Sequence, residues 1–419
     1  MNTPGMDFLN SRLTFGMSLG LRGMKSLCEA FQFPERSFRS IHIVGTNGKG
    51  SASFYLAGLL QAHGARVGFF SSPHLVSVRE RIRFQDAPIP EADLERLLFQ
   101  VREVSAKIHL EPSFFETITM VSLLYFREMK VEYAVLEAGL GGRLDTTSVA
   151  EGFAALLTSI GLEHTEILGN TEEKILKEKL GILRPETVLF AGDLSDKLLS
   201  LARSIAEPLH VKVVPAEKFK ISAAVPNLGK HYQENADLAI TAARFILGGR
   251  WNANLAAEVL PKRAWAGRMQ VLKNAAGKIR FILDGAHNSH AVKRLTETLA
   301  ESFPGQKFTC LFAVLQDKDC DEMISMLRPF ISEWVLTRTP YPRFQDLDVL
   351  RTRFDAQGIQ VTRTEMLSEK LIKSLESSEN PVLVTGSLYM IGAVIQLLKT
   401  NYPELSFFEN LSVTFNENH

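Results

Sequence analysis

The stretch IHIVGTNGKGS, residues 41–51, decides how the first part of this chain folds. An apolar run typical of a β-strand leads into a turn with three glycines, and a helical pattern follows. Gly45, Gly48 and Gly50 allow successive backbone N–H groups to turn toward one point, and Lys49 adds a mobile positive charge. The stretch therefore predicts a phosphate-binding loop between a strand and a helix.

The spacing of this loop departs from the common phosphate-binding pattern G-x-x-x-x-G-K-[ST]. Lys49 follows Gly45 by four positions, and Gly50 lies between Lys49 and Ser51. The Ser51 hydroxyl is still placed to reach a magnesium ion at the helix start. Taken alone, the loop is also compatible with a tight strand-to-helix connection that binds nothing.

Length and composition describe a globular protein with sizeable cores. The 419 residues predict two or three domains, and 45% of them are apolar. The 47 basic and 47 acidic side chains cancel, so we expect a small-molecule ligand and neither nucleic acid nor membrane as partner. The N-terminus has no signal-peptide pattern and no apolar run reaches the ~20 residues of a membrane span. Cys28, Cys310 and Cys320 lack metal-ligand spacing, which favours a cytoplasmic location.

Short apolar runs alternate with helical patterns along the whole chain, which predicts mostly parallel sheets flanked by helices. After the glycine-rich loop, residues 51–64 space their apolar side chains like one helix face. The segment PKRAWAG, which begins at Pro261, reads as a hinge, and a second series of strands follows it. We expect a P-loop parallel-sheet ATPase domain at residues 1–262 and a smaller Rossmann-like α/β domain at 263–419.

Ligands of open parallel sheets lie beyond the carboxyl ends of the strands, so chemistry is sought there. Glu137 ends an apolar strand and suits Mg²⁺, although a solvated acid at a strand end is the alternative. His164 follows another strand and Lys179 lies in a charged helix; alone, such residues are more often structural. Ser72 precedes a proline, which is first of all a turn signal.

The second domain offers the segment LDGAHNSHA, in which Asp284 ends a strand and His287 and Asn288 follow it. These side chains suit ribose, phosphate or an amino-acid substrate, and the alternative is a capped helix start. Upstream, Arg268 lies near the expected hinge, where a guanidinium can reach nucleotide phosphates in a closed state.

Taken together, these strings resemble the folylpolyglutamate synthase and dihydrofolate synthase family, of the bacterial bifunctional type, within the Mur ligase superfamily. The resemblance covers nearly the whole chain, and the shortened lysine loop is the form that this family uses. The matching strings, in order, are GTNGKGS (45–51), SSPHL (71–75), FFETIT (114–119), EAGLGGRLDTTS (137–148), GLEHTEILGNT (161–171), EKLGIL (178–183), AGRMQVL (266–272), LDGAHNSHA (283–291), DKD (317–319) and TGSLYMIG (385–392).

The resemblance implies roles for individual residues. It implies two Mg²⁺ ions, a CO₂-derived carbamate on Lys179, and a potassium ion. The implied ATP contacts are Gly48, Lys49, Gly50, Ser51, Asn235, Arg268 and Asp284, and the implied metal ligands are Ser72, Glu137, His164 and carbamylated Lys179. The implied catalytic residues are Lys49, Lys179, His164 and Arg268. The implied pterin or folate contacts are Ser113, Phe114, Phe115, Glu116, Leu144, Asp145 and Thr146, and the implied glutamate contacts are His287 and Ser387.

Four positions depart from the pattern of the family, and none removes an implied ligand. Glu163 stands where an aspartate usually precedes the histidine, and Leu180 replaces a small residue. Tyr232 stands in place of a glutamine in HYQENA, and Ser289 in place of a proline. These departures affect the expected shape of the nucleotide and second-metal sites.

The implied reaction is ATP-dependent amide formation, in which L-glutamate is joined through an acyl phosphate to dihydropteroate or to the γ-carboxylate of a reduced folate. We expect a monomer. One alternative is a Mur-type ligase acting on a UDP-muramyl acceptor. The strings FFETIT and EAGLGGRLDTTS stand against it, and with the loop beginning at residue 45 we expect no additional N-terminal UDP domain. A P-loop GTPase or a nucleotide-gated binding protein is a second alternative; no guanine-reading N-K-x-D occurs, and the second domain would be unexplained.

Overall fold

The computed structural model describes residues 3–14, 20–219, 225 and 229–401, which form two compact α/β units. The first unit holds most of the chain up to Arg263, and the second holds the chain from Ala264 onward. Two short segments, His74–Ser77 and Val225–Gln233, also belong to the second unit. Each unit is built on one sheet whose inner strands are parallel, so the predicted α/β fold class is confirmed.

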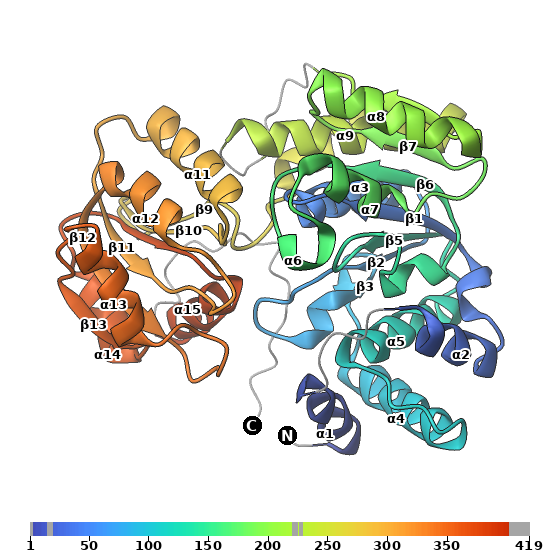
Figure 1. Ribbon diagram of the computed structural model, residues 1–419, viewed down its shortest axis with the longest axis horizontal. Helices are drawn as coiled ribbons and strands as arrows, with labels where there is room; N and C mark the ends of the chain where they lie inside the picture. The colour runs from blue at the N-terminus through green and yellow to red at the C-terminus, as the bar shows by residue number, and fades with distance from the viewer. Residues whose placement is uncertain (1–2, 15–19, 220–224, 226–228, 402–419) are drawn as a thin grey trace. The chain divides into compact units, whose positions relative to one another are not determined.

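The sheet of the first unit has the strand order β4-β3-β2-β5-β1-β6-β7-β8 (Figure 1). The strands from β2 to β8 in this order are parallel, and β3 and β4 join one edge in antiparallel fashion. Their bounds are β1 Arg39–Val44, β2 Val67–Phe70, β3 Ile82–Phe84, β4 Ala87–Pro88, β5 Tyr133–Glu137, β6 Gly152–Leu157, β7 Val188–Ala191 and β8 Lys212–Pro215.

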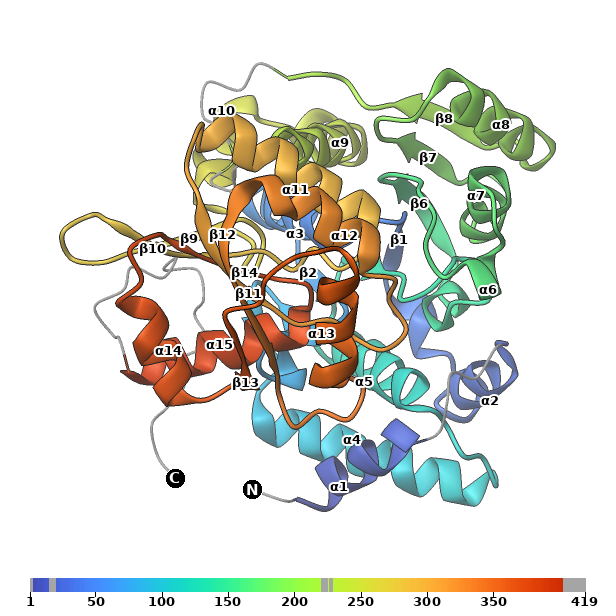
Figure 2. The same ribbon diagram turned by 60° about the vertical axis from the view of Figure 1, so that its left-hand side comes forward.

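Two apolar clusters bind helices to this sheet. One joins helices α2, α4 and α5 to strands β2 and β5, and the other joins α7 and α8 to β6 and β7; Figure 2 shows α8 beside β8. The helices are α1 Pro4–Ser11, α2 Arg22–Ala30, α3 Lys49–Ala62, α4 Glu91–Lys107, α5 Phe114–Glu128, α6 Thr165–Leu168, α7 Glu172–Leu180, α8 Asp196–Ala206, α9 Lys230–Leu247 and α10 Ala253–Val259.

Helix α3, which follows the glycine-rich loop, differs from the sequence prediction. The spacing of apolar residues indicated one buried face, but every residue from Ser51 to Leu60 is buried. The reason is that α3 packs on β1, β2 and β5 and is also contacted by α10. Small residues such as Ala57 and Gly58 make this close packing possible, and the Arg263 guanidinium occupies the space beside Gly58.

The sheet of the second unit has the strand order β13-β12-β11-β14-β10-β9, in which only β9 is antiparallel to its neighbour. Helices α14 and α15 cover one face of it and share an apolar cluster with β10, β11 and β14. The strands are β9 Gln270–Lys273, β10 Ile279–Leu283, β11 Phe308–Phe312, β12 Ile331–Arg338, β13 Arg363–Met366 and β14 Val382–Thr385; the helices are α11 Ser289–Ser302, α12 Asp321–Leu327, α13 Leu347–Ala356, α14 Glu369–Glu376 and α15 Leu388–Asn401.

Membrane-spanning helices are not found in the part of the chain that the structure describes. None of its helices combines the length and the apolar character needed to cross a bilayer.

Candidate active site

Four adjacent parallel strands of the first sheet, in the order β2-β5-β1-β6, deliver predicted site residues at their carboxyl ends. Ser72 follows β2, Glu137 ends β5, the loop from Gly45 follows β1, and His164 follows β6 (Figure 1). The register pairs Glu137 with Ile43, two residues before Gly45. Because parallel strands end at the same edge of a sheet, the fold gathers these segments at one edge.

The glycine-rich loop adopts a backbone that requires glycine. Gly45 and Gly48 have φ angles of +149° and +85°, values that favour glycine. A Cβ atom on Gly45 would lie 1.9 Å from Thr158 Oγ1, and one on Gly48 would lie 2.4 Å from Asn235 Oδ1. Gly48 precedes α3 and provides no side-chain cap, so the N–H groups of the first helical turn remain suited to an anion.

The loop is tied to the neighbouring strand by residues that sequence reasoning missed. The Thr158 hydroxyl donates to Asn47 O over 2.6 Å, and Thr46 N donates to Ser159 O over 2.7 Å. A Thr-Ser pair directly after an apolar strand is a weak signal by itself. Its role becomes visible only because β6 lies beside β1 in the sheet.

The side-chain nitrogens of two lysines meet at one backbone carbonyl of the loop. Lys49 Nζ donates to Gly45 O and Thr46 O, both at 3.0 Å. Lys179 Nζ, from the end of α7, donates to Gly45 O at 2.7 Å. The predicted phosphate-binding lysine and the predicted modified lysine therefore lie at the same atom, although they are far apart in the sequence.

The pKa of Lys179 is lowered to about 7. Burial is the largest cause, since the residue is 3% exposed, and the nearby charge of Lys49 acts in the same direction. The carboxylates of Glu163 and Asp145 partly offset these effects. At neutral pH a large fraction of Lys179 is therefore a neutral amine, the form of lysine that reacts as a nucleophile.

Glu137 and Ser72 are joined at the same edge of the sheet. Ser72 N donates to Glu137 Oε2 at 3.1 Å, and the Glu137 side chain is buried. His164 immediately precedes α6 and has a left-handed φ of 49°, an uncommon backbone conformation for a residue other than glycine. The described residues contain no ready-made group of three or more His, Cys, Asp or Glu side chains around one metal position.

The predicted pterin segment at the start of α5 forms a capping box. Ser113 Oγ accepts from Glu116 N at 3.3 Å, and Glu116 Oε2 accepts from Ser113 N at 2.9 Å. The Phe115 ring packs 5.8 Å from the ring of Phe70, and Phe114 lies 5.2 Å from the Arg81 guanidinium. Both phenylalanines thus contribute to packing, and Phe114 also lies beside a cation.

The second predicted pterin segment is linked to the first. Thr146 Oγ1 and Thr119 Oγ1, on α5, lie 2.9 Å apart. Asp145 is buried and accepts from Leu140 N at 2.9 Å and from Thr147 N at 3.0 Å. Burial raises its pKa despite these hydrogen bonds. Leu144, before it, is half-buried.

In the second unit, Asp284 lies at the carboxyl end of β10. It accepts hydrogen bonds from Met269 N at 2.8 Å and from Ala286 N at 2.9 Å. The Arg268 guanidinium faces this carboxylate and lowers its pKa, but burial has the larger effect and raises it overall. Asn288, considered in the sequence as a ligand or a cap, caps α11 by accepting from Ala291 N at 2.8 Å.

The two predicted glutamate-binding residues lie at neighbouring strand ends, β10 and β14. His287 Nδ1 lies 2.7 Å from Gly285 O. Because a carbonyl only accepts, Nδ1 carries the proton and a neutral ring leaves Nε2 as an acceptor. Ser387 is buried just before α15, and its hydroxyl has no hydrogen-bond partner among the described residues. A buried hydroxyl of this kind suits a polar ligand.

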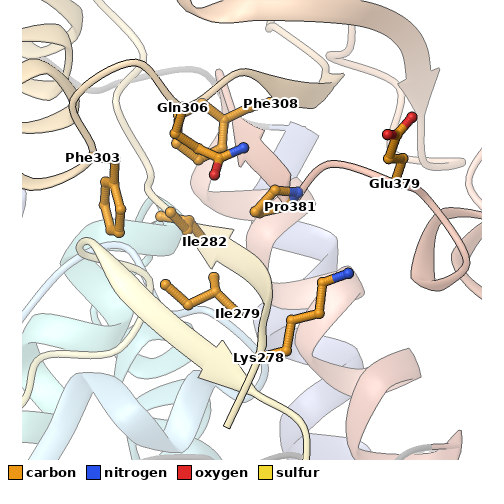
Figure 3. A pocket seen from close by; sticks show the side chains of 8 residues that line it. All are labelled: Lys278, Ile279, Ile282, Phe303, Gln306, Phe308, Glu379 and Pro381. Atoms are coloured by element: carbon orange, nitrogen blue, oxygen red, sulfur yellow. The ribbon is translucent and has the colours of Figure 1, made fainter.

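A cavity of about 240 Å³ lies at the opposite end of the second sheet, where β10, β11 and β14 begin (Figure 3). Most of its lining residues are apolar, and none of them is a predicted site residue. It is lined by Lys278, Ile279, Ile282, Phe303, Gln306, Phe308, Glu379 and Pro381.

The chain combines a glycine-rich loop, suited to phosphate, at the carboxyl edge of one parallel sheet with a second α/β unit. This combination is the architecture of the two-domain Mur-type ligases. Residues 267–388 match the family model described as Mur ligase, glutamate ligase domain. The chain resembles the folylpolyglutamate synthase of Thermotoga maritima, with a TM-score of 0.80, 28% identity, and coverage of 94% and 97% of the two chains. A Mycobacterium tuberculosis folylpolyglutamate synthase complexed with ADP gives a TM-score of 0.83, 25% identity, and coverage of 94% and 98%.

The particular family follows from a curated relative. The dihydrofolate synthase/folylpolyglutamate synthase of Bacillus subtilis (strain 168) is 33% identical over 94% of this chain and 98% of its own length. The chain belongs to the dihydrofolate synthase/folylpolyglutamate synthase family. It is accordingly an ATP-dependent acid–amino-acid ligase, and the muramyl-ligase alternative is not favoured.

Proposed function

We propose that this chain joins L-glutamate to dihydropteroate, giving dihydrofolate, and to the γ-carboxylate of reduced folates. The names of its relatives support both acceptors, because the Bacillus subtilis relative carries both activities in its name. The single observation that carries the proposal is the meeting of Lys49 and Lys179 at the Gly45 carbonyl, beside the strand that ends in Glu137.

The reaction consists of two transfers. An oxygen of the acceptor carboxylate attacks the γ-phosphorus of ATP, the bond to ADP breaks, and an acyl phosphate forms. The amine nitrogen of L-glutamate then attacks the acyl carbon, phosphate leaves, and the nitrogen loses a proton. Lys49 and the N–H groups at the start of α3 hold the phosphates. Arg268 and Asp284 are proposed nucleotide contacts, and His287 and Ser387 are proposed to hold L-glutamate.

The oxygen-rich edge of the first sheet fits magnesium. Glu137 is a buried carboxylate at a strand end, and Ser51 and Ser72 add hydroxyls; hard oxygen ligands of this kind are those that Mg²⁺ prefers. We assign two ions to Ser72, Glu137, His164 and modified Lys179. When bound, magnesium would neutralise charge on the phosphate groups.

Lys179 fits the proposed carbamate. Its lowered pKa gives a neutral amine, which forms an N–C bond with CO₂ and releases a proton. The product is an anion, which the positive charge of Lys49 attracts, whereas it repels the protonated form of Lys179. We also propose that the enzyme uses a potassium ion, which an assay with NaCl in place of KCl tests. We propose that the chain is a monomer, which light scattering tests.

A side-by-side assay tests the acceptor. Purified chain is supplied with ATP, Mg²⁺ and L-glutamate, and with dihydropteroate in one series and tetrahydrofolate in the other. In each series we expect a glutamylated product, identified by its mass, and one ADP for each amide bond formed. ADP release that requires a UDP-muramyl acceptor would contradict the proposal.

A further inference from the structure

One hydrogen bond in the second unit links two segments far apart in the sequence. The Tyr232 hydroxyl, in the first turn of α9, donates to Asp284 Oδ2 at 3.2 Å. Both residues are buried, at 3% and 5% exposure. The hydrogen bond thus joins the start of α9 to the carboxyl end of β10 within the second unit.

The hydrogen bonds of Asp284 fix the orientation of its carboxylate. Oδ2 accepts from Tyr232 and from Met269 N, while Oδ1 accepts from Ala286 N. A carboxylate offers about four lone-pair positions, so these three donors leave about one position for a ligand hydroxyl. Two of the donors are backbone N–H groups, which only a substitution to proline removes, and Tyr232 supplies the side-chain donor.

We propose that Tyr232 is a positioning residue for nucleotide binding, which holds the Asp284 carboxylate in the orientation that accepts a hydrogen bond from ATP. This inference rests on the proposed function, in which Asp284 contacts the nucleotide. It assigns to Tyr232 an effect on nucleotide affinity that acts through Asp284 and does not require contact with ATP.

The surroundings of Tyr232 restrict the movement of its ring. The ring of His231 lies 4.1 Å from that of Tyr232, and burial lowers the pKa of His231 to about 3. His231 is therefore neutral under ordinary conditions and adds no charge beside the carboxylate. A buried phenol with few rotamers loses little entropy in holding one hydrogen bond, which suits a positioning role.

The test compares two substitutions that differ in the donor. Tyr232→Phe removes only the hydroxyl, whereas Tyr232→Gln replaces it with an amide donor. We expect the Kd for ATP to rise about 3- to 10-fold in the Phe variant, the range for loss of a hydrogen bond of ordinary strength. Because the amide can still donate, the Kd for ATP of the Gln variant is expected to stay within about threefold of the wild-type value. Tyr125→Phe, in the core of the first unit, is the matched control with unchanged affinity.

A pH series separates positioning from a general structural effect. Removal of the Tyr232 hydroxyl takes away a hydrogen bond that lowers the Asp284 pKa, so that pKa rises further. Arg268 is the charged group that faces Asp284 and is present in all variants. The pH below which ATP binding weakens therefore moves upward in Tyr232→Phe, while a merely structural change leaves it in place.

Isothermal titration of the 419-residue chain with ATP measures these constants without requiring amide formation. The inference is overturned if the Phe and Gln variants bind ATP with equal affinity and the pH below which ATP binding weakens does not change. The proposed function would remain intact in that case. If the wild-type chain forms no amide bond, the proposed function is overturned instead. If Tyr232→Phe does not fold, Tyr232→Met replaces it in the same comparison with Tyr232→Gln.

Discussion

The carboxyl edges of the two sheets have the same architecture but carry different polar groups. At the edge of the first sheet, the side-chain nitrogens of Lys49 and Lys179 share the Gly45 carbonyl. At the edge of the second, the buried carboxylate of Asp284 is surrounded by three hydrogen-bond donors. The amines of the first edge are suited to an added anion, whereas the Asp284 carboxylate of the second edge already has three donors that hold it in place. In the proposed function, the first edge binds phosphate and the second binds hydroxyl and amine groups.

The largest expected effect is at Lys49, and it sharpens the view of the first edge as a phosphate site. Lys49→Ala removes the charge nearest the loop, and we expect ATP turnover to fall at least ~10³-fold, the scale of lost charge stabilisation in phosphoryl transfer. Steady-state kinetics with circular dichroism check this result. Turnover that persists at the wild-type rate in a folded variant would remove Lys49 from the phosphate site.

The second prediction concerns Lys179 as a modified residue. Lys179→Ala is expected to lower kcat by roughly 10²- to 10³-fold, and added formate or acetate restores part of it by replacing the carbamate anion. The exposed Lys174, on the same helix, provides the matched control in Lys174→Ala. A Lys179→Ala enzyme with full activity would show that the first edge functions without this side chain.

The third prediction concerns the free energy of unfolding, which depends on pH because the pKa of Lys179 is lowered at the first edge. An unfolded lysine has a pKa near 10.5 and the folded one about 7, so the unfolded state binds more protons between these values. The wild type therefore gains stability relative to Lys179→Met as the pH rises from 7 to 10, by up to about 1.4 kcal/mol per pH unit. Urea unfolding in CO₂-free buffer measures the difference, with Lys174→Met as control. A pH-independent difference would contradict the buried, neutral amine.

The smallest effect is expected at Ser387, on the second edge. Because its hydroxyl has no partner among the described residues, Ser387→Ala should change the free energy of unfolding by less than about 0.5 kcal/mol. If that hydroxyl binds L-glutamate, the KM for glutamate rises roughly 5- to 10-fold, the effect of one lost hydrogen bond. Parallel measurements of unfolding and of KM distinguish the two outcomes. A large loss of stability with unchanged KM would make Ser387 a packing residue.

The sequence by itself determined the glycine-rich loop, the alternation of strands and helices, and the family. These are local properties, because a strand pattern, a turn that needs positive φ, and a run of short motifs are all written in neighbouring residues. Gly45 and Gly48 illustrate this, since their backbone angles are those that the loop pattern predicts. Lys179, by contrast, is an ordinary lysine in a charged helix as far as local pattern is concerned.

Only the tertiary structure decided the chemical state of such residues. The pKa of Lys179 depends on burial and on Lys49, and its contact with Gly45 spans 134 positions of sequence. The bond between Tyr232 and Asp284 likewise spans 52 positions. Burial and electrostatic interaction depend on distance in space, which the order of strands in a sheet sets and the spacing of residues along the chain does not.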